Sequence, residues 1–440
     1  MKQQSLPMFC DQCEQSFRGT GCVDRGVCGK SPDVEAAQKL LLYGVKGMAA
    51  YKAHARRLGK TDAEVEAFIE SALFATMTNV NFDLDRMLEM ALECGRMNYK
   101  TMQLLNDGHV ELFGAPSPAE VVEGIQEGPG ILVTGHDLLD LKHVLDAVSG
   151  TDIKVYTHGE MLPAHMYPKL REHPNLAGHF GGAWQKQRRE FEQFGGPIVA
   201  TTNCVLIPSH TSSYGSRLYT MREVAVPGSP RLLDGQLDVV VTKAKEIGAL
   251  SPTARKRSTV GFHYTAVLAQ AGAVVEAVKS GAIRRFFVIG GCDGAEPGRN
   301  YFSDFAQNAP QDSVILTLGC GKYRIRDHDY GTVAGLPRLL DMGQCNNAYG
   351  AVQVALALAD AFGCGVNDLP LDLVISWFEQ KAVAVLLTLL HLGVKGIRIG
   401  PNPPPFLTAK LMTVLQEKFD LKLIGTDGKA DVAAAMAAAS

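Results

Sequence analysis

The stretch GILVTGHDLLDLKHVLDAVSG, residues 130–150, decides the fold of this chain. Its first half is a short apolar, β-branched run typical of a buried strand, and its second half carries apolar residues at helical spacing. Further strand-like runs alternate with helical ones at residues 152–160, 196–208, 237–243, 284–294, 313–321, 371–379, 394–400 and 421–427. This alternation predicts an α/β fold with two doubly wound, Rossmann-like parallel-sheet domains.

The residues before this region have a different pattern. Three long segments of helical period occupy residues 31–60, 61–78 and 82–107 and predict a three-helix bundle. Ser31 is the expected N-cap of the first helix with Pro32 at its first position, and Thr61 and Glu64 form an expected capping box at the second. A Pro- and Gly-rich linker and a polar stretch at residues 248–261 then separate three domains, predicted at 1–124, 125–255 and 256–440.

Composition excludes several classes of function. The 440 residues include 43 Lys and Arg against 46 Asp and Glu, without a long run of one sign, so we expect no nucleic-acid partner. The longest apolar run, residues 382–394, is too short to cross a bilayer, and residues 1–12 lack the apolar core of a secretory signal. We therefore expect a soluble, cytoplasmic protein that does not bind membranes.

Four of the ten cysteines, Cys10, Cys13, Cys22 and Cys28, fall within nineteen residues. In a reducing compartment, clustered cysteines favour metal binding over disulfides. Four thiolates in a short loop suit a structural zinc ion and an iron–sulfur cluster equally well, so this stretch alone leaves both open. Cys94 and Cys364 lie within or at the end of helical runs, and we assign them no role.

Seven residues with metal-binding side chains fall at strand ends or helix starts, where ligands of parallel α/β sheets collect. They are His136, Glu160, Cys204, Cys292, Cys320, Cys345 and Glu379. Thiolates favour soft metals and iron–sulfur assemblies, whereas carboxylates favour harder, oxygen-bound ions. If the sheets face each other, a mixed cluster with sulfide-bridged iron at one end and oxygen-ligated iron at the other would use all seven.

Nucleotide-binding motifs are not found. LTLGCGKY resembles a phosphate-binding loop, but Leu316 stands where its first glycine is required and Tyr323 where a magnesium-binding hydroxyl is required. The run GGCDGAEPG does not have the G-x-G-x-x-G spacing of dinucleotide-binding proteins. We therefore expect electrons to come from another protein.

The motifs CDQC, GHDLLDL, YTHGEMLPAH, TTNC, GGCDGAEPGR, LGCGKYR, GQCNNAYGA and WFEQKAVAVLL occur in this order between residue 8 and about residue 425. Together they resemble the hybrid cluster protein family, also called prismane proteins. The resemblance implies that Cys10, Cys13, Cys22 and Cys28 hold a 4Fe-4S cluster. It implies that the seven later residues hold a hybrid 4Fe-2S-2O cluster, with Cys292 carrying a persulfide in oxidised members.

One departure concerns the length of the chain. Typical family members have a second helical bundle before the strand that carries GHD, but only about thirty residues separate NYKTMQLLND from His136. The chain therefore resembles a shortened class of the family. The missing bundle would leave one face of the core uncovered, or covered by an oligomer partner.

The resemblance implies reduction of hydroxylamine to ammonia and water, with reduction of nitric oxide to nitrous oxide as a second activity. Open iron positions would bind the substrate, and a nearby acid would protonate its oxygen. Candidate catalytic residues are Glu160, Cys292, Glu379, His158 and Lys381. His158 and Lys381 could equally serve to orient Glu160 and Glu379. The 4Fe-4S cluster would relay electrons from an external redox protein.

Three alternatives stay open. A nickel–iron carbon monoxide dehydrogenase has a similar core and would contain stoichiometric nickel. A nitric oxide sensor or protein S-nitrosylating factor would use Cys292 as an exchangeable thiol and would not turn over repeatedly. A zinc-stabilised scaffold would be colourless.

Overall fold

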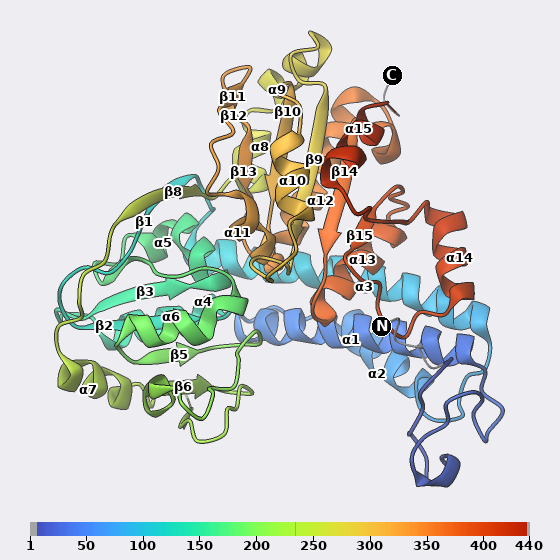
Figure 1. Ribbon diagram of the computed structural model, residues 1–440, viewed down its shortest axis with the longest axis horizontal. Helices are drawn as coiled ribbons and strands as arrows, with labels where there is room; N and C mark the ends of the chain where they lie inside the picture. Colours follow the sequence, from blue (N-terminus) through green and yellow to red (C-terminus); the bar gives the residue numbers. More distant parts are fainter. Residues whose placement is uncertain (1–6, 234, 438–440) are drawn as a thin grey trace. The chain divides into compact units, whose positions relative to one another are not determined.

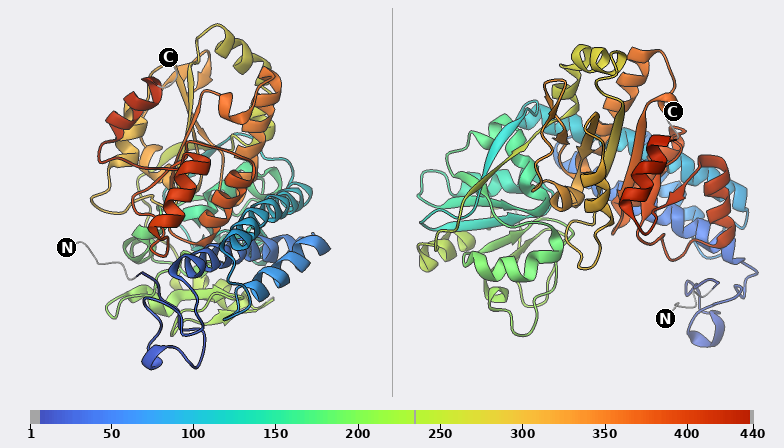
Figure 2. Two further views of the ribbon diagram at one scale, coloured as in Figure 1. Left: turned by 90° about the vertical axis from the view of Figure 1, so that its right-hand side faces the viewer. Right: turned by 45° about the horizontal axis from the view of Figure 1, so that its top comes forward.

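The computed structural model describes residues 7–233 and 235–437, which divide into two compact units. The first unit draws on the ranges Met1–Leu105 and Val366–Thr426, and the second on Asn106–Gly365 and Asp427–Ser440. Both units mix helices with parallel strands, so the predicted α/β class is confirmed. Figures 1 and 2 show the elements as ribbons whose colours follow the chain from blue at the N-terminus to red at the C-terminus.

The first unit contains the long helices near the N-terminus and a small parallel sheet. Its elements are α1 (Pro32–Arg57), α2 (Ala63–Ala75), most of α3 (Leu84–Phe113), β14 (Leu371–Ser376), α13 (Gln380–His391), β15 (Arg398–Gly400), α14 (Ala409–Phe419) and β16 (Lys422–Leu423). Strand β15 pairs in parallel with both β14 and β16. The three predicted N-terminal helices are therefore present, and they share a unit with residues far along the chain.

Glycines allow helix α13 to lie close to α1 and α3. A Cβ atom on Gly47 would overlap the carbonyl oxygen of Gln380, and one on Gly95 would overlap that of Leu387. Thr388 adds hydrogen bonds at this approach, because its hydroxyl accepts from Asn98 Nδ2 at 2.9 Å and donates to the carbonyl oxygen of Gly95 at 3.0 Å. The N-terminal end of α13, where Glu379 lies, is thereby fixed within this unit.

The second unit contains a larger, eight-stranded sheet in the order β7-β6-β5-β2-β3-β4-β1-β8. Its strands are β1 (Ala119–Glu123), β2 (Gly130–Thr134), β3 (Lys154–His158), β4 (Leu176–His179), β5 (Ile198–Ala200), β6 (Leu218–Met221), β7 (Arg231–Leu232) and β8 (Lys256–Val260). All neighbours pair in parallel except β1 and β8. The chain runs outward from β2 to β4 and then returns to β5 beside β2. The order of the strands therefore reverses between β2 and β5, where doubly wound folds bind ligands.

Three more parallel strands of this unit, β9 (Arg285–Gly291), β10 (Ser313–Thr317) and β13 (Leu339–Asp341), pair in the order β13-β10-β9. A small hairpin joins β11 (Thr332–Val333) to β12 (Leu336–Pro337). The helices of the unit are α4 (Leu138–Ala147), α5 (Pro168–Arg171), α6 (Gln187–Phe194), α7 (Asp238–Ile247), α8 (Tyr264–Leu268), α9 (Ala271–Lys279), α10 (Tyr301–Asn308), α11 (Lys322–Ile325), α12 (Ala348–Phe362) and α15 (Gly428–Ala437).

Two local predictions are wrong. Residues 237–243, expected as a strand, begin helix α7, whose buried residues Val240 and Ala244 lie one helical turn apart. The N-cap of α2 is Asp62 and not Thr61, because the Asp62 carboxylate accepts from the backbone N–H of Val65 at 3.1 Å. The cap at Ser31 is confirmed, since its hydroxyl accepts from the N–H of Val34 at 3.3 Å.

The apolar run at residues 382–394 forms most of α13, and many of its side chains are buried in protein. In the described part of the chain, no helix combines the length and the hydropathy needed to cross a bilayer.

Candidate functional site

The predicted ligands of the large sheet follow the carboxyl ends of neighbouring strands. His136 comes two residues after β2, Glu160 two residues after β3, and Cys204 four residues after β5. Because β2 lies between β3 and β5, the three residues emerge at one edge of the sheet, at the point where the strand order reverses. His136 and Glu160 are buried, with exposed fractions of 1% and 5%.

The tightest group consists of His136, Glu160 and Cys345, whose ligand atoms all lie within 4.8 Å of one another. Among the described residues, this is the one group of three such side chains close enough to hold a single metal ion. The backbone N–H of Cys345 donates to Glu160 Oε2 at 2.9 Å, which joins the loop after β13 to the loop after β3. One nitrogen, one oxygen and one sulfur donor atom thus lie close together, two of them from buried residues and the sulfur from the half-buried Cys345.

A cavity of about 210 Å³, including the part open to solvent, adjoins this group. Its lining includes four predicted ligands, His136, Glu160, Cys204 and Cys320, together with neighbours of mixed character. The neighbours are Thr134, Gly135, Gly159, Trp184, Gln187 and Asn203.

Cys320 joins the strands β9 and β10 to the same site. Burial raises the pKa of its thiol well above the usual value, and the negative charges of Glu160, Cys204 and Cys292 raise the pKa further. The Cys320 thiol therefore lies within electrostatic reach of three acidic side chains, Glu160, Cys204 and Cys292. Such an arrangement favours a cation, because a positive charge at the centre would offset their mutual repulsion.

The neighbours of His136 orient its ring. The Thr202 hydroxyl accepts from the backbone N–H of His136 at 2.8 Å and lies 2.8 Å from its Nδ1. A metal-binding histidine commonly uses one ring nitrogen as ligand and directs the other to an oxygen. Contact of Nδ1 with Thr202 therefore leaves Nε2 as the nitrogen that suits a metal.

Side chains of α6 and the preceding turn hold the cysteine loops. Gln187 donates from Nε2 to the carbonyl oxygen of Cys204 and accepts from the N–H of Leu206 at 3.0 Å. Cys204 has a φ of +66°, a conformation that costs energy in a residue other than glycine and persists only where its surroundings enforce it. Trp184 Nε1 and Gln185 Nε2 both donate to the carbonyl oxygen of Cys292, at 3.2 Å and 3.3 Å.

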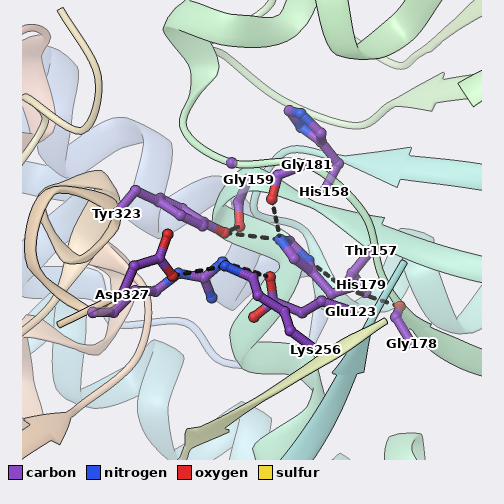
Figure 3. Close-up of polar contacts among 12 residues, drawn as sticks. Glu123, Thr157, His158, Gly159, Gly178, His179, Gly181, Lys256, Tyr323 and Asp327 are labelled. Carbon is purple, nitrogen blue, oxygen red and sulfur yellow. Dashed lines mark hydrogen bonds and ion pairs between the residues drawn. The ribbon is translucent and has the colours of Figure 1, made fainter. Parts of the chain in front are cut away.

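The turn that carries Glu160 is held from two directions. Gln344 Nε2 donates to the carbonyl oxygen of Glu160 at 2.5 Å, and the Tyr323 hydroxyl donates to that of Gly159 at 2.7 Å. Figure 3 shows Tyr323 also meeting His179 Nε2, at 3.1 Å. Burial and the charge of Arg326 hold the pKa of His179 well below its usual value, so the ring is neutral and its Nε2 can meet a hydroxyl.

His158 points to a different set of partners. Its Nε2 lies 3.0 Å from Glu190 Oε2 and its Nδ1 lies 3.1 Å from the hydroxyl of Thr134. Burial would raise the pKa of Glu190, but the hydrogen bond and charge of His158 outweigh that effect and the pKa is lowered. Glu190 also accepts from the N–H of Gly182 at 3.0 Å, so the pair links β3 to α6 and to the loop between β4 and α6.

Glu379 and Lys381 belong to the first unit. Glu379 is the N-cap of α13, where its Oε2 accepts from the backbone N–H of Lys381 at 3.0 Å. The buried Lys381 ammonium lies 3.7 Å from Glu379 Oε1 and 6.0 Å from the centre of the Tyr51 ring. Within its own unit, Glu379 is therefore held in place by the start of the helix and by a buried cation.

The N-terminal loop brings two of its four cysteines together through the backbone. Cys10 and Cys22 exchange N–H to carbonyl hydrogen bonds of 3.0 Å and 2.8 Å, and both side chains are buried. Cys13 is half-buried and Cys28 is exposed. The buried ammonium of Lys30 lies 3.5 Å from the sulfur of Cys10. The four sulfurs are not among the groups close enough for one ion, and ligands of different irons in a cluster lie further apart than ligands of a single ion.

Sequence reasoning missed the residues that hold the ligands. Gln344 had a detectable signal, since it directly precedes Cys345. Gln187 and Trp184 had none, because they contact Cys204 and Cys292 from far away in the sequence. In the sequence, Tyr323 stands out only because it occupies the position at which a phosphate-binding loop has its magnesium-binding residue.

The chain is similar in sequence to proteins of known name over most of its length. The chain is 57% identical to a hydroxylamine reductase of Moorella thermoacetica over 95% of this chain and 98% of the relative. It is 50% identical to a hydroxylamine reductase of Rhodospirillum rubrum over 93% of this chain but 74% of that relative, so about a quarter of the latter has no counterpart in the alignment. The shortened form is thus shared with the Moorella protein.

Structural comparison gives the same fold. The carbon monoxide dehydrogenase IV of Carboxydothermus hydrogenoformans superimposes with a TM-score of 0.80 at 14% identity, covering 99% of this chain and 93% of that one. The family model described as "Prismane/CO dehydrogenase family" matches residues 8–91 and 83–432. Because that match spans nearly the whole chain, the chain belongs to the Prismane/CO dehydrogenase family.

Proposed function

We propose that this protein reduces hydroxylamine, NH₂OH + 2e⁻ + 2H⁺ → NH₃ + H₂O, at an iron–sulfur–oxygen cluster in the second unit. The observation that carries the proposal is the meeting of His136, Glu160 and Cys345 within 4.8 Å beside a cavity lined by two further predicted ligands. The high identity to two hydroxylamine reductases supports the choice of substrate.

The residues present fit such a cluster. Thiol, carboxylate and imidazole ligands meet in one buried region, and such a mixed set suits iron bound to both sulfur and oxygen better than a single zinc ion. We propose that the ligands are His136, Glu160, Cys204, Cys292, Cys320 and Cys345, with Glu379 added on the strength of its sequence motif. Cys292 is the proposed persulfide carrier. When bound, the cluster supplies electrons and open positions for a small nitrogen–oxygen substrate.

The side chains around the cavity select and orient the substrate. The cavity of about 210 Å³, which includes a part open to solvent, is the proposed place for a molecule of hydroxylamine size. Glu160 is the proposed acid for the departing oxygen when its carboxyl group is released from the metal and protonated, because that group borders this cavity and its backbone is fixed by Gln344 and Tyr323. We assign His158 an orienting role, since its ring nitrogens contact Thr134 and Glu190. Lys381 is assigned the same role toward Glu379.

We propose that Cys10, Cys13, Cys22 and Cys28 hold a 4Fe-4S cluster that passes electrons onward from a separate, cytoplasmic redox protein. The loop is a suitable entry point because Cys28 is exposed while Cys10 and Cys22 are buried. Cluster potential responds to such differences in solvent exposure and to hydrogen bonds at the sulfurs.

The similarity to a carbon monoxide dehydrogenase rests on 14% identity and carries the fold but not the reaction. Nickel analysis of the purified holoenzyme separates the two activities, because the proposed enzyme contains iron without stoichiometric nickel. Two four-iron clusters predict roughly eight irons per chain.

The direct test measures hydroxylamine-dependent oxidation of a reduced viologen dye, with ammonia as the quantified product. Substituting Cys292→Ala or Glu379→Ala should abolish turnover while the electron paramagnetic resonance (EPR) spectrum of the N-terminal cluster stays intact. Cys364→Ala is the matched control, because Cys364 lies just after α12, outside the proposed ligand set, and should keep full activity.

Retained turnover in Cys292→Ala or Glu379→Ala would refute the assignment. Parallel assays with nitric oxide decide whether nitrous oxide is a second product. Binding of nitric oxide without repeated turnover would instead support a sensor.

A further inference from the structure

A buried lysine contacts one of the N-terminal cysteines. Lys30 follows Cys28 by two residues, and its side chain has an exposed fraction of 0%. Its ammonium lies 2.6 Å from Glu35 Oε2, 2.7 Å from Gln38 Oε1 and 3.5 Å from the sulfur of Cys10. An ammonium group has three donors, and here a carboxylate, an amide and a cysteine sulfur take one each.

The acceptors are held in position by their own neighbours. Glu35 and Gln38 lie on the first turns of α1 and are 2% and 1% exposed. Gln38 Nε2 donates to the carbonyl oxygen of Asn81 at 3.1 Å, which fixes the amide with its oxygen toward Lys30. The loop closes on the lysine through a hydrogen bond of 2.9 Å from the N–H of Gly26 to the carbonyl oxygen of Lys30.

Burial of this ion pair is costly, because both charges give up their hydration. A loop that needed only structural support could use apolar side chains at these positions, often without loss of stability. The third donor of Lys30 also points at a thiol and not at a carbonyl oxygen, which would be a stronger acceptor. These features indicate a charge placed for its effect on the group that Cys10 holds.

We propose that the Lys30–Glu35 pair sets the reduction potential of the N-terminal cluster, with Lys30 raising the potential through its charge and its N–H···S contact with Cys10. This inference rests on the proposed function, in which Cys10 is a ligand of a 4Fe-4S cluster. An added electron makes the cluster more negative, so a nearby cation and a hydrogen bond to sulfur stabilise the reduced form. Glu35 keeps the cation in place and offsets part of its charge. Lys30 is thus a positioning residue for the potential.

A neighbouring lysine provides a matched control. Lys39 lies 3.4 Å from the other oxygen of Glu35 and donates to the carbonyl oxygen of Phe9 at 2.5 Å. Its side chain is 26% exposed, so solvent and salt screen its charge more strongly. It therefore shares the carboxylate and the loop with Lys30 but makes its loop contact to a backbone oxygen.

The experiment is a redox titration of the holoenzyme followed by EPR, with the N-terminal signal assigned by its loss in Cys28→Ala. Lys30→Met should shift the reduction equilibrium at least tenfold toward the oxidised form, a change of 59 mV for a one-electron couple. Lys30→Arg should leave the reduction potential of the N-terminal cluster close to that of the natural protein, because arginine keeps the positive charge and the N–H donors. Lys39→Met should shift the potential much less than Lys30→Met.

An unchanged potential in Lys30→Met, or an equal shift in Lys39→Met, would overturn the inference. If Lys30→Met does not assemble the cluster, Glu35→Gln decides the matter, because loss of the negative charge should raise the potential. A fall or no change in that variant would overturn the proposal as well. A wild-type protein with no redox-active N-terminal signal would instead refute the proposed cluster, and hydroxylamine turnover is not used in this comparison.

Discussion

The hydroxyl of Tyr323 lies 2.7 Å from the carbonyl oxygen of Gly159, the residue directly before Glu160. Gly159 has a φ of +56°, in the left-handed region that favours glycine. The contact therefore holds a tight turn at the point where the chain leaves β3, and it connects that turn to helix α11. Figure 3 shows the same hydroxyl meeting His179.

Removing this hydroxyl should affect both stability and catalysis. We expect Tyr323→Phe to lower the free energy of unfolding by about 1–3 kcal/mol, because a buried carbonyl oxygen loses its donor. It should also lower kcat for hydroxylamine without changing the N-terminal EPR signal. Tyr330→Phe is the control, since the Tyr330 hydroxyl is buried with no hydrogen-bond partner among the described residues. Equal effects of the two substitutions would contradict the role given to Tyr323.

Gln187 should matter for cluster retention more than for folding. Its side chain holds Cys204 and Leu206, so Gln187→Leu frees a loop whose cysteine has an unfavourable φ. We expect the variant to contain less iron after purification. Its apoprotein should have a thermal midpoint close to that of the apoprotein with the natural sequence. Gln193→Leu, on the exposed side of the same helix, should leave the iron content unchanged. Full iron occupancy in Gln187→Leu would count against this role.

The approach of α3 to α13 makes Gly95 sensitive to substitution. Gly95→Ala should lower the free energy of unfolding by roughly 1–3 kcal/mol, because its methyl group overlaps the Leu387 carbonyl oxygen and forces the helices apart. Gly272→Ala is the opposite case, since no atom lies within 4 Å of a Cβ at that helical position. It should stabilise the protein by up to about 1 kcal/mol. Denaturant unfolding measures both, and a stabilised Gly95→Ala would refute the close approach.

Buried histidines predict a loss of stability in mild acid. Burial lowers the pKa of His263 from 6.5 to about 4, and its ring nitrogens lie 3.0 Å from the Thr265 hydroxyl and 3.1 Å from Asn106 Oδ1. Above pH 6.5 the ring is neutral in both states. As the pH falls from 6.5 toward 4, the unfolded chain binds a proton that the folded chain does not, so folding becomes less favourable.

At pH 5.5 this group should cost roughly 1–2 kcal/mol relative to pH 7.5. Denaturant midpoints at the two pH values measure the effect, and His263→Gln should make the difference smaller. The same change at the exposed His210 should leave the difference as it is. An unaltered pH dependence in His263→Gln would show that other groups cause it.

The fold class could be predicted because it follows from local patterns, and the same patterns place the candidate ligands at the ends of strands. The apolar run before His136 and the helical run after it define a strand, a turn and a helix, and parallel strands then place their ends at one edge. Helix α7 was misread because three consecutive valines suggest a strand. The spacing of Val240 and Ala244 reveals its buried helical face only when the neighbouring elements are known.

The supporting contacts could not be predicted, since each joins residues far apart in the chain. Nothing near Tyr323 identifies Gly159 as its acceptor, and nothing near Gln187 identifies Cys204. The contact of Lys30 with Cys10 likewise depends on how the loop closes on α1. Sequence patterns identify side chains suited to a metal, whereas three-dimensional packing determines which groups orient them.

The hydrogen bond between Thr388 and Gly95 has a consequence for the synthesis of the protein. The two residues are separated by 293 positions, so α3 leaves the ribosome long before α13 can cover it. During that interval the small-residue faces of α1 and α3 stay exposed to solvent. The first unit can therefore reach its final packing only late in translation, and the nascent chain needs protection from aggregation until then.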